Sequence, residues 1–244
     1  MEAEDRSELA SLPIREMLFV GGGVFSISAV ANFRSPLLPD IGGELAMSPG
    51  QLGLVMTAFA VGRLLTNVPA GILVDRIGVT WIYAISGAVL GIGSTMFALA
   101  PTPWWVLAGS AIVGVATAMS MTSGMTYFSG VVGPRYRGRV MSILSASLLG
   151  GQAIGPVLSG ALADAGTWRT AMVLAAVVGA VIAVGGTTAA LRRRSQATAV
   201  SAASEGSADP LQLGVRLRVA LYAVPFGTMF MMGSLPNTLV PIIG

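Results

Sequence analysis

The chain alternates between long uncharged, mostly apolar segments and short charged ones. A helix needs about 20 apolar residues to cross the hydrocarbon core of a membrane, and the uncharged segments have about this length. The longest, from Ile77 to Pro134, exceeds one crossing and is divided by the turn signal Ala100-Pro101-Thr102-Pro103. The pattern predicts seven membrane-spanning helices, near residues 17–38, 51–74, 79–99, 104–131, 140–163, 169–190 and 219–241.

Basic residues gather on one side of the predicted spans. If the amino terminus is cytoplasmic, eleven of the fourteen basic residues, all of them Arg, lie on the cytoplasmic side. Because cytoplasmic loops of membrane proteins are enriched in Lys and Arg, this orientation is favoured over its reverse. We expect a multi-pass protein of the cytoplasmic membrane, embedded in the lipid bilayer with its amino terminus inside.

Two polar segments divide the chain. Residues 1–16 are acidic and polar and lack the basic region and cleavage site of a signal peptide, so they are predicted to form a cytoplasmic tail. Residues 192–218 are rich in Ser and Ala and are predicted to form a disordered cytoplasmic loop. A six-span bundle is expected at 17–191 and a seventh span at 219–244. Because the chain ends with this span, we expect it to be truncated.

The composition excludes several classes of protein. Apolar residues make up 54% of the chain and charged residues 10%, against about 25% charged in soluble domains. The absence of Cys and His rules out a disulfide framework, a Ser-His-Asp triad and a Cys/His metal site. The absence of Lys argues against a P-loop. We therefore expect neither an enzyme, nor a metal site, nor an organic cofactor, nor a nucleic-acid partner.

A short loop is predicted between the second and third spans, in the sequence Gly71-Ile72-Leu73-Val74-Asp75-Arg76-Ile77-Gly78. We expect Gly71 to allow two backbones to approach closely, Asp75 to interact with a helix amino terminus, and Arg76 to pair with an acid or lie among the headgroups. The segment resembles the loop signature of the major facilitator superfamily, G-x-L-x-D-R-x-G-R-R/K. It departs from that signature after Gly78, where the family carries basic residues.

A strip of small side chains is predicted on the fifth span. Small residues recur at every fourth position, which favours close packing against another helix: Ser147, Gly151, Gly155, Ser159 and Ala163. Pro156 removes one backbone hydrogen bond and is expected to bend the helix. The segment also resembles the family's antiporter motif, G-x8-G-x3-G-P-x2-G-G, which is typical of drug/proton exchangers: Gly151, Gly155, Pro156 and Gly160 match it, whereas Ser142 and Ser159 stand where the motif has Gly. Packing alone explains the strip equally well.

The resemblance begins near residue 16 and corresponds to the amino-terminal half of a twelve-span transporter plus its central loop and seventh span. It implies an all-α polytopic bundle of two inverted three-helix repeats, followed by a seventh helix. In the family the substrate path runs between two halves, so a carboxyl-terminal half is an expected partner, from the same gene or from another chain. The family's fourth-span Arg, which is associated with proton transfer, is replaced by Ser110.

Charged and polar residues within the spans are the candidates for a substrate or coupling pathway. Arg63 lies about 18 Å along its span, where a charge costs about 2.5–3.5 kcal/mol on insertion scales unless it faces the bundle interior or a water-filled cavity. Asn67 lies one turn further on the same face, and Gln152 is a further candidate. Backbone carbonyls of a neighbouring helix could instead satisfy Arg63. Arg34 is also a candidate, although we expect its side chain to extend to the membrane interface.

The resemblance implies transport of a small solute by alternating access. Its motif pattern favours proton-coupled efflux of a drug-like or metabolite compound. No acidic residue lies in the middle of a predicted span, so a proton carrier is expected in the other half. Two alternatives remain: an inactive truncated fragment of such a transporter, or a half-transporter that needs a partner chain.

Overall fold

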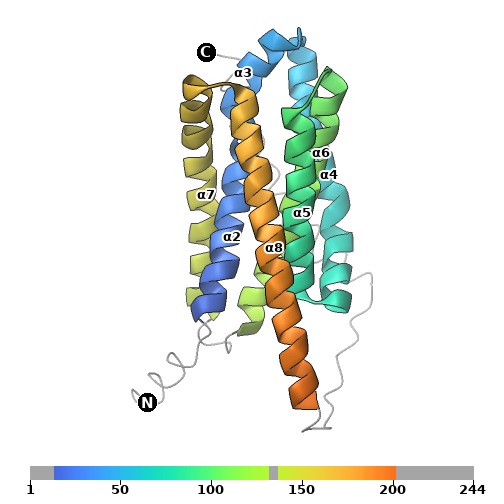
Figure 1. Ribbon diagram of the computed structural model, residues 1–244, viewed down its shortest axis with the longest axis vertical. Helices are drawn as coiled ribbons and strands as arrows, with labels where there is room; N and C mark the ends of the chain where they lie inside the picture. The colour runs from blue at the N-terminus through green and yellow to red at the C-terminus, as the bar shows by residue number, and fades with distance from the viewer. Residues whose placement is uncertain (1–13, 132–136, 202–244) are drawn as a thin grey trace.

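The computed structural model describes residues 14–131 and 137–201, which form an all-α bundle (Figure 1). Its helices in these residues are α2 (Ile14–Asn32), α3 (Arg34–Glu44), α4 (Pro49–Ile77), α5 (Val79–Ala98), α6 (Pro103–Val131), α7 (Arg137–Ala165) and α8 (Trp168–Ser201). Six segments are long and apolar enough to cross a membrane, with α2 and α3 counted as one. The first six predicted spans are therefore confirmed, and the seventh, at 219–241, lies outside the described residues.

The first span is broken at Phe33 and extends to Glu44, past the predicted end at residue 38. Pro36 explains the break, because it has no N–H to donate to the carbonyl of Asn32 and its ring crowds that carbonyl. Proline is tolerated in the first turn of a helix, where the N–H groups lack helical partners. A new helix, α3, therefore starts at Arg34 and carries the span to its end.

Local signals fix the start of α4 and the length of α8. Ser48 Oγ accepts a hydrogen bond from the backbone of Gln51 (3.3 Å), and Gln51 Oε1 accepts one from the backbone of Ser48 (2.9 Å), so a capping box begins α4 at Pro49. Helix α8 continues to Ser201, past the predicted boundary at 191, because residues 192–201 contain no Gly or Pro to end it. The remainder of the predicted loop lies outside the described residues, and the other domain boundaries stay predictions.

The helices pack in pairs that follow the predicted repeat. Helix α2 lies along α7, α4 along α6, and α5 along both α6 and α8. Exchanging the first three spans with the last three converts the α2–α7 pair into the α6–α4 pair, as two equivalent three-helix units require. Figure 1 shows α7 and α4 at opposite sides of the bundle, with the other spans between them.

Small residues set the closest contacts between paired helices. A Cβ atom added to Gly87 of α5 would lie 2.6 Å from the backbone nitrogen of Ala183 on α8. One added to Gly179 of α8 would lie 2.5 Å from the backbone nitrogen of Gly91. Such distances leave no room for a side chain, so the two backbones are in direct contact. The third and sixth spans are thereby held together.

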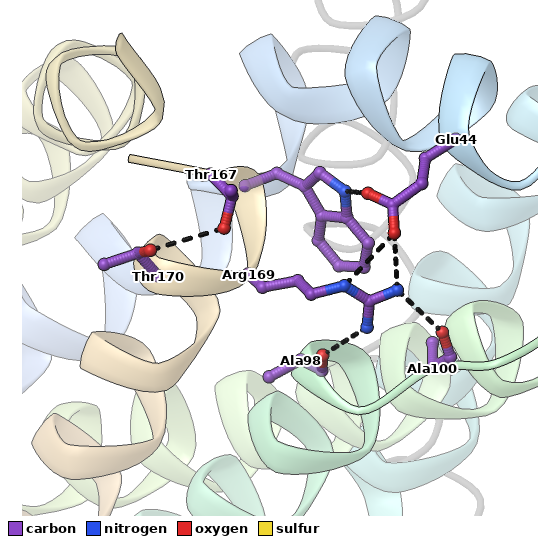
Figure 2. A network of polar contacts seen from close by, with 7 residues as sticks. Glu44, Ala98, Ala100, Thr167, Arg169 and Thr170 are labelled. Carbon is purple, nitrogen blue, oxygen red and sulfur yellow. Dashed lines mark hydrogen bonds and ion pairs between the residues drawn. The ribbon is translucent and has the colours of Figure 1, made fainter. Parts of the chain in front are cut away.

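One end of the bundle, which we call the Glu44 end, is closed by a polar network (Figure 2). Glu44 forms an ion pair with Arg169 Nη2 (2.7 Å) and accepts a hydrogen bond from the indole of Trp168. Arg169 also donates to the carbonyls of Ala98 (2.7 Å) and Ala100 (3.3 Å). The network joins the end of α3, the α5–α6 connection and the start of α8.

At the opposite end, a single residue joins α4 to α5. Gly78 has φ +89° and ψ 154°, donates its N–H to the carbonyl of Val74 (3.0 Å) and accepts from the N–H of Ile82 (3.3 Å). Residues with a side chain rarely adopt this conformation. Gly71 is different: apart from its chain neighbours and its own helix backbone, no described atom lies within 4 Å of the place that its Cβ would occupy. The expected close approach at Gly71 is therefore wrong for the described residues, because no backbone of another described helix lies opposite it.

We expect Gly78→Ala to lower the free energy of unfolding by about 1–3 kcal/mol, because it forces a side chain into a strained backbone conformation. Gly71→Ala is the matched control in the same loop motif. We expect it to cause no loss of stability, because the position of the added Cβ atom is unoccupied. Thermal unfolding in detergent measures both. Equal melting temperatures for wild type and Gly78→Ala would contradict the role given to the turn.

Candidate functional site

Arg34 lies inside the bundle and not at the membrane interface. It is 8% exposed, and its Cζ atom lies 3.6 Å from the ring centroid of Phe59 on α4, a cation–π contact. Its Nε atom is buried and has no hydrogen-bond partner in the described part of the chain. The expected extension to the interface is therefore wrong. Because α3 starts directly after the break at Phe33, its first side chain remains within the bundle and meets an aromatic ring there.

Arg63 lies one helical turn after Phe59 on α4, so the two side chains share a face of the helix. It is half-buried, and its neighbour on this face, Phe59, is the residue that contacts Arg34. Asn67, a further turn along, is also half-buried. The structure thus places Arg34 and Arg63 next to the same aromatic residue and places Asn67 next in the same row.

Helix α6 packs directly against this part of α4. A Cβ atom on Gly114 would lie 3.0 Å from the carbonyl carbon of Phe59 and 3.1 Å from the backbone nitrogen of Arg63. Ser110 is buried and donates a hydrogen bond of 2.7 Å to the carbonyl of Val55. The position at which the resemblance leads us to expect Arg is therefore used here to attach α6 to α4.

The two arginines have no acidic partner in residues 14–131 and 137–201. The ion pair of this region joins Glu44 and Arg169 at the Glu44 end. Within the described ranges, neither the Arg34 nor the Arg63 side chain forms a hydrogen bond. The alternative in which a neighbouring helix's carbonyls satisfy Arg63 thus finds no support in the described residues.

Gln152, the remaining pathway candidate, is exposed on α7. Helix α7 pairs with α2 and not with α4. Within the described residues, the side chain of Gln152 forms no hydrogen bond with Arg34 or Arg63. The structure therefore does not join it to the two arginines.

The packing face predicted on the fifth span is confirmed for Gly151 and Gly155. A Cβ atom on Gly151 would lie 3.0 Å from the backbone nitrogen of Ala29 on α2, and one on Gly155 would lie 2.9 Å from the carbonyl carbon of the same residue. Helix α7 continues through Pro156. Gly160 has no described atom within 4 Å of its Cβ position, so this part of the motif lies off the α2 contact. Whether the motif has a transport role stays a prediction.

The loop motif lies at the surface. Asp75, Arg76 and Gly78 are all exposed at the α4–α5 turn. Asp75 is three residues before the turn and therefore close to the amino terminus of α5, where a negative charge is favourable. A role for this loop in conformational change stays a prediction.

Phe59 and Glu44 were not among the residues that the sequence singled out. Phe59 resembles any other apolar residue of a span, and its only signal is that it precedes Arg63 by one turn. Glu44 is the last charge before the uncharged segment Leu45–Gly62, but its partner Arg169 is 125 residues away. A contact over that distance cannot be assigned from one sequence.

An open hollow of about 570 Å³ lies at the Glu44 end. Asp40, Glu44 and Asp164 contribute to its lining, together with Trp168. Its acidic residues are exposed, and the part of the chain that the structure describes contains no group of three or more residues able to hold a metal ion. The lining of the hollow does not include Arg34 or Arg63, so these two arginines remain the candidate site.

A family model described as Major Facilitator Superfamily matches residues 20–244. A human protein named solute carrier family 2, facilitated glucose transporter member 10, is 29% identical over 155 residues, which cover 62% of this chain and 28% of that protein. A probable nitrate transporter of Staphylococcus epidermidis is 26% identical over 168 residues, covering 62% of this chain and 41% of the relative.

A solved structure has a similar fold. A bacterial homolog of the human lysosomal transporter Spinster, in an inward-facing and occupied conformation, superposes with a TM-score of 0.65 and 18% identity. The match covers 73% of this chain and 44% of that one. At this identity the likeness concerns the fold alone. The chain spans less than half the length of these relatives.

We expect Gly155→Ala to lower the free energy of unfolding by about 1–3 kcal/mol, because its new methyl group overlaps the backbone of Ala29 and separates two helices. Gly160→Ala changes the same motif at an open position, so we expect it to leave stability unchanged or slightly raised. Melting temperatures in detergent compare the two. An equal loss in both variants would argue against the α2–α7 contact.

Proposed function

The chain belongs to the major facilitator superfamily, and from this membership we propose that it transports a small solute across the cytoplasmic membrane by alternating access. The observation that carries the proposal is the pair of arginines inside a six-span bundle, one of them buried against Phe59. Charged residues within membrane spans are costly and face the substrate or ion pathway of transporters. Arg63 and Arg34 are the proposed pathway residues, with Asn67 beside them.

We propose that the bundle works with a second half, supplied by the same polypeptide or by a partner chain. In transporters built from repeats, the substrate site lies near the middle of the bilayer between the units. Two observations support this arrangement: the chain spans less than half the length of its relatives, and α4 and α7 are the least covered spans, with 17% and 28% of their apolar windows buried. The cytoplasmic amino terminus remains supported by the distribution of Arg.

Proton-coupled efflux of a drug-like or metabolite compound is the mode of transport that we propose. Its support is the antiporter-like spacing of Gly151, Gly155, Pro156 and Gly160. The spans that the structure describes contain no carboxylate in their middle. We therefore propose that the proton carrier belongs to the second half. The relatives are named for glucose and for nitrate, so their names do not select one solute.

We expect Arg63→Ala to reduce transport to background while membrane expression is retained, because it removes a pathway charge from a half-buried site. Arg192→Ala is the matched control, since this Arg is exposed near the end of α8. Solute flux in membrane vesicles and the amount of protein in the membrane are both measured. Unchanged flux in Arg63→Ala would remove Arg63 from the pathway.

Proton coupling is tested with inside-out vesicles whose lumen is acidified. The solutes are fluorescein, rhodamine 6G, glucose and nitrate, and vesicles without the protein are the control. We expect at least one solute to accumulate in the lumen, and we expect a protonophore to abolish the accumulation, because export is exchanged for protons. Accumulation that survives the protonophore would contradict proton coupling. Absence of flux for every solute would favour an inactive fragment or a half that needs its partner.

A further inference from the structure

We propose that Arg34, Arg63 and Phe59 form a binding site for a small oxyanion, such as a carboxylate or a phosphate, and that the transported solute carries this group. The inference rests on the proposed transport function and narrows its substrate class to anions. It goes beyond membership of the family, whose named relatives include proteins for an uncharged sugar and for an anion.

The first step is electrostatic. Arg34 is 8% exposed and contacts Phe59, and Arg63, one turn along α4 from Phe59, carries a charge of the same sign. Like charges repel more strongly when water is excluded, because the effective dielectric constant falls. A buried charge is also costly unless it is paired. The arrangement therefore lacks negative charge, and a bound anion would supply it between or beside the two guanidinium groups.

The second step concerns what could neutralise the arginines within the described residues. Glu44 is already paired with Arg169. Asp40 shares α3 with Arg34, but it is exposed and lies about 9 Å further along the helix axis at 1.5 Å per residue. The ring of Phe59 offers a cation–π contact, which attracts one guanidinium but adds no net negative charge. The described part of the protein thus leaves the pair with an excess of positive charge.

The third step is the geometry of the donors. The Cζ atom of Arg34 lies 3.6 Å from the ring centroid of Phe59, and this cation–π contact gives the guanidinium N–H groups no lone-pair acceptor. The Nε atom on the edge of the guanidinium is buried and has no hydrogen-bond partner in the described residues. Such an edge matches the two oxygens of a carboxylate or phosphate. Arg63, which is half-buried, gives the site a more accessible second charge.

This combination discriminates between solute classes. A cation would be repelled by both arginines. An uncharged solute could accept hydrogen bonds from them but would leave their mutual repulsion in place. An oxyanion satisfies the free donors and lowers the repulsion at the same time, so the site favours it over both other classes.

The test measures binding and flux separately on the 244-residue chain. The purified protein is held in neutral detergent, and its melting temperature is followed during titration with phosphate, succinate or benzoate against chloride at equal ionic strength. We expect at least one oxyanion to raise the melting temperature. Arg34→Gln and Arg63→Gln should each weaken its apparent affinity about tenfold or more, because each removes a charged hydrogen-bond donor.

Arg192→Gln is the charge-matched control and should bind as the wild type does. If Arg34→Gln does not fold, Arg63→Gln gives the test, because its site on α4 is only half-buried. Unchanged affinity in Arg63→Gln, or stabilisation by glucose or rhodamine 6G but by no oxyanion, would overturn the proposal. A second titration distinguishes a free oxyanion from the phosphate of a lipid headgroup as the bound group. It uses nanodiscs of phosphatidylcholine with and without phosphatidylglycerol. Stabilisation by phosphatidylglycerol without any response to free oxyanions would overturn it as well.

Flux in proteoliposomes distinguishes this inference from the proposed function. Oxyanion binding that depends on Arg63, without flux of any solute, would support the site and argue against transport by this chain alone. Flux restricted to glucose or rhodamine 6G would leave transport in place and overturn the anionic substrate class. Flux of the oxyanion that stabilises the protein would support both.

Discussion

The arrangement of the bundle depends on direct contact between helix backbones at small residues. Lipid chains are as apolar as Leu, so helices in a membrane gain little from hiding apolar side chains from lipid, and close van der Waals contact decides which faces meet. Gly155 meets Ala29 between α7 and α2, Gly114 meets the backbone of Phe59 between α6 and α4, and Gly179 meets Gly91 between α8 and α5. Each contact joins a span of one three-helix repeat to a span of the other, so the repeats interlock.

The arginine site is a consequence of this packing combined with one break in a helix. Contact with Gly114 fixes the backbone of α4 between Phe59 and Arg63. The break at Phe33 makes Arg34 the first residue of a new helix within the bundle. These two constraints bring the Arg34 guanidinium over the ring of Phe59. The Arg34 guanidinium, which was expected at the membrane interface, therefore lies in the interior of the bundle.

The features that depend on local pattern could be predicted from the sequence, and those that depend on tertiary contact could not. Charge-free lengths predicted the six spans that lie in the described residues, and four-residue spacing predicted the face of α7 that carries Gly151 and Gly155. The direction of Arg34 was predicted wrongly, because it is set by a ring on another helix. The prediction of a close backbone approach at Gly71 was also wrong for the described residues, since a loop signature does not say which helix lies opposite. The end of α8 at Ser201 was missed because Ser and Ala are compatible with both a loop and a helix.

Ser110 clarifies how charge is distributed in this protein. The resemblance leads to an expectation of Arg at this position, which would add a further positive charge to α6 next to the α4 backbone. Ser110 is instead buried and donates its hydroxyl to the carbonyl of Val55, one turn before Phe59. Ser110 thus provides, in place of a charge, a contact that orders α4 just ahead of Phe59 and Arg63. Under the proposed function, any electrostatic selection of a solute by the described residues therefore depends on Arg34 and Arg63, and the packing of α6 against α4 determines how Arg63 is positioned.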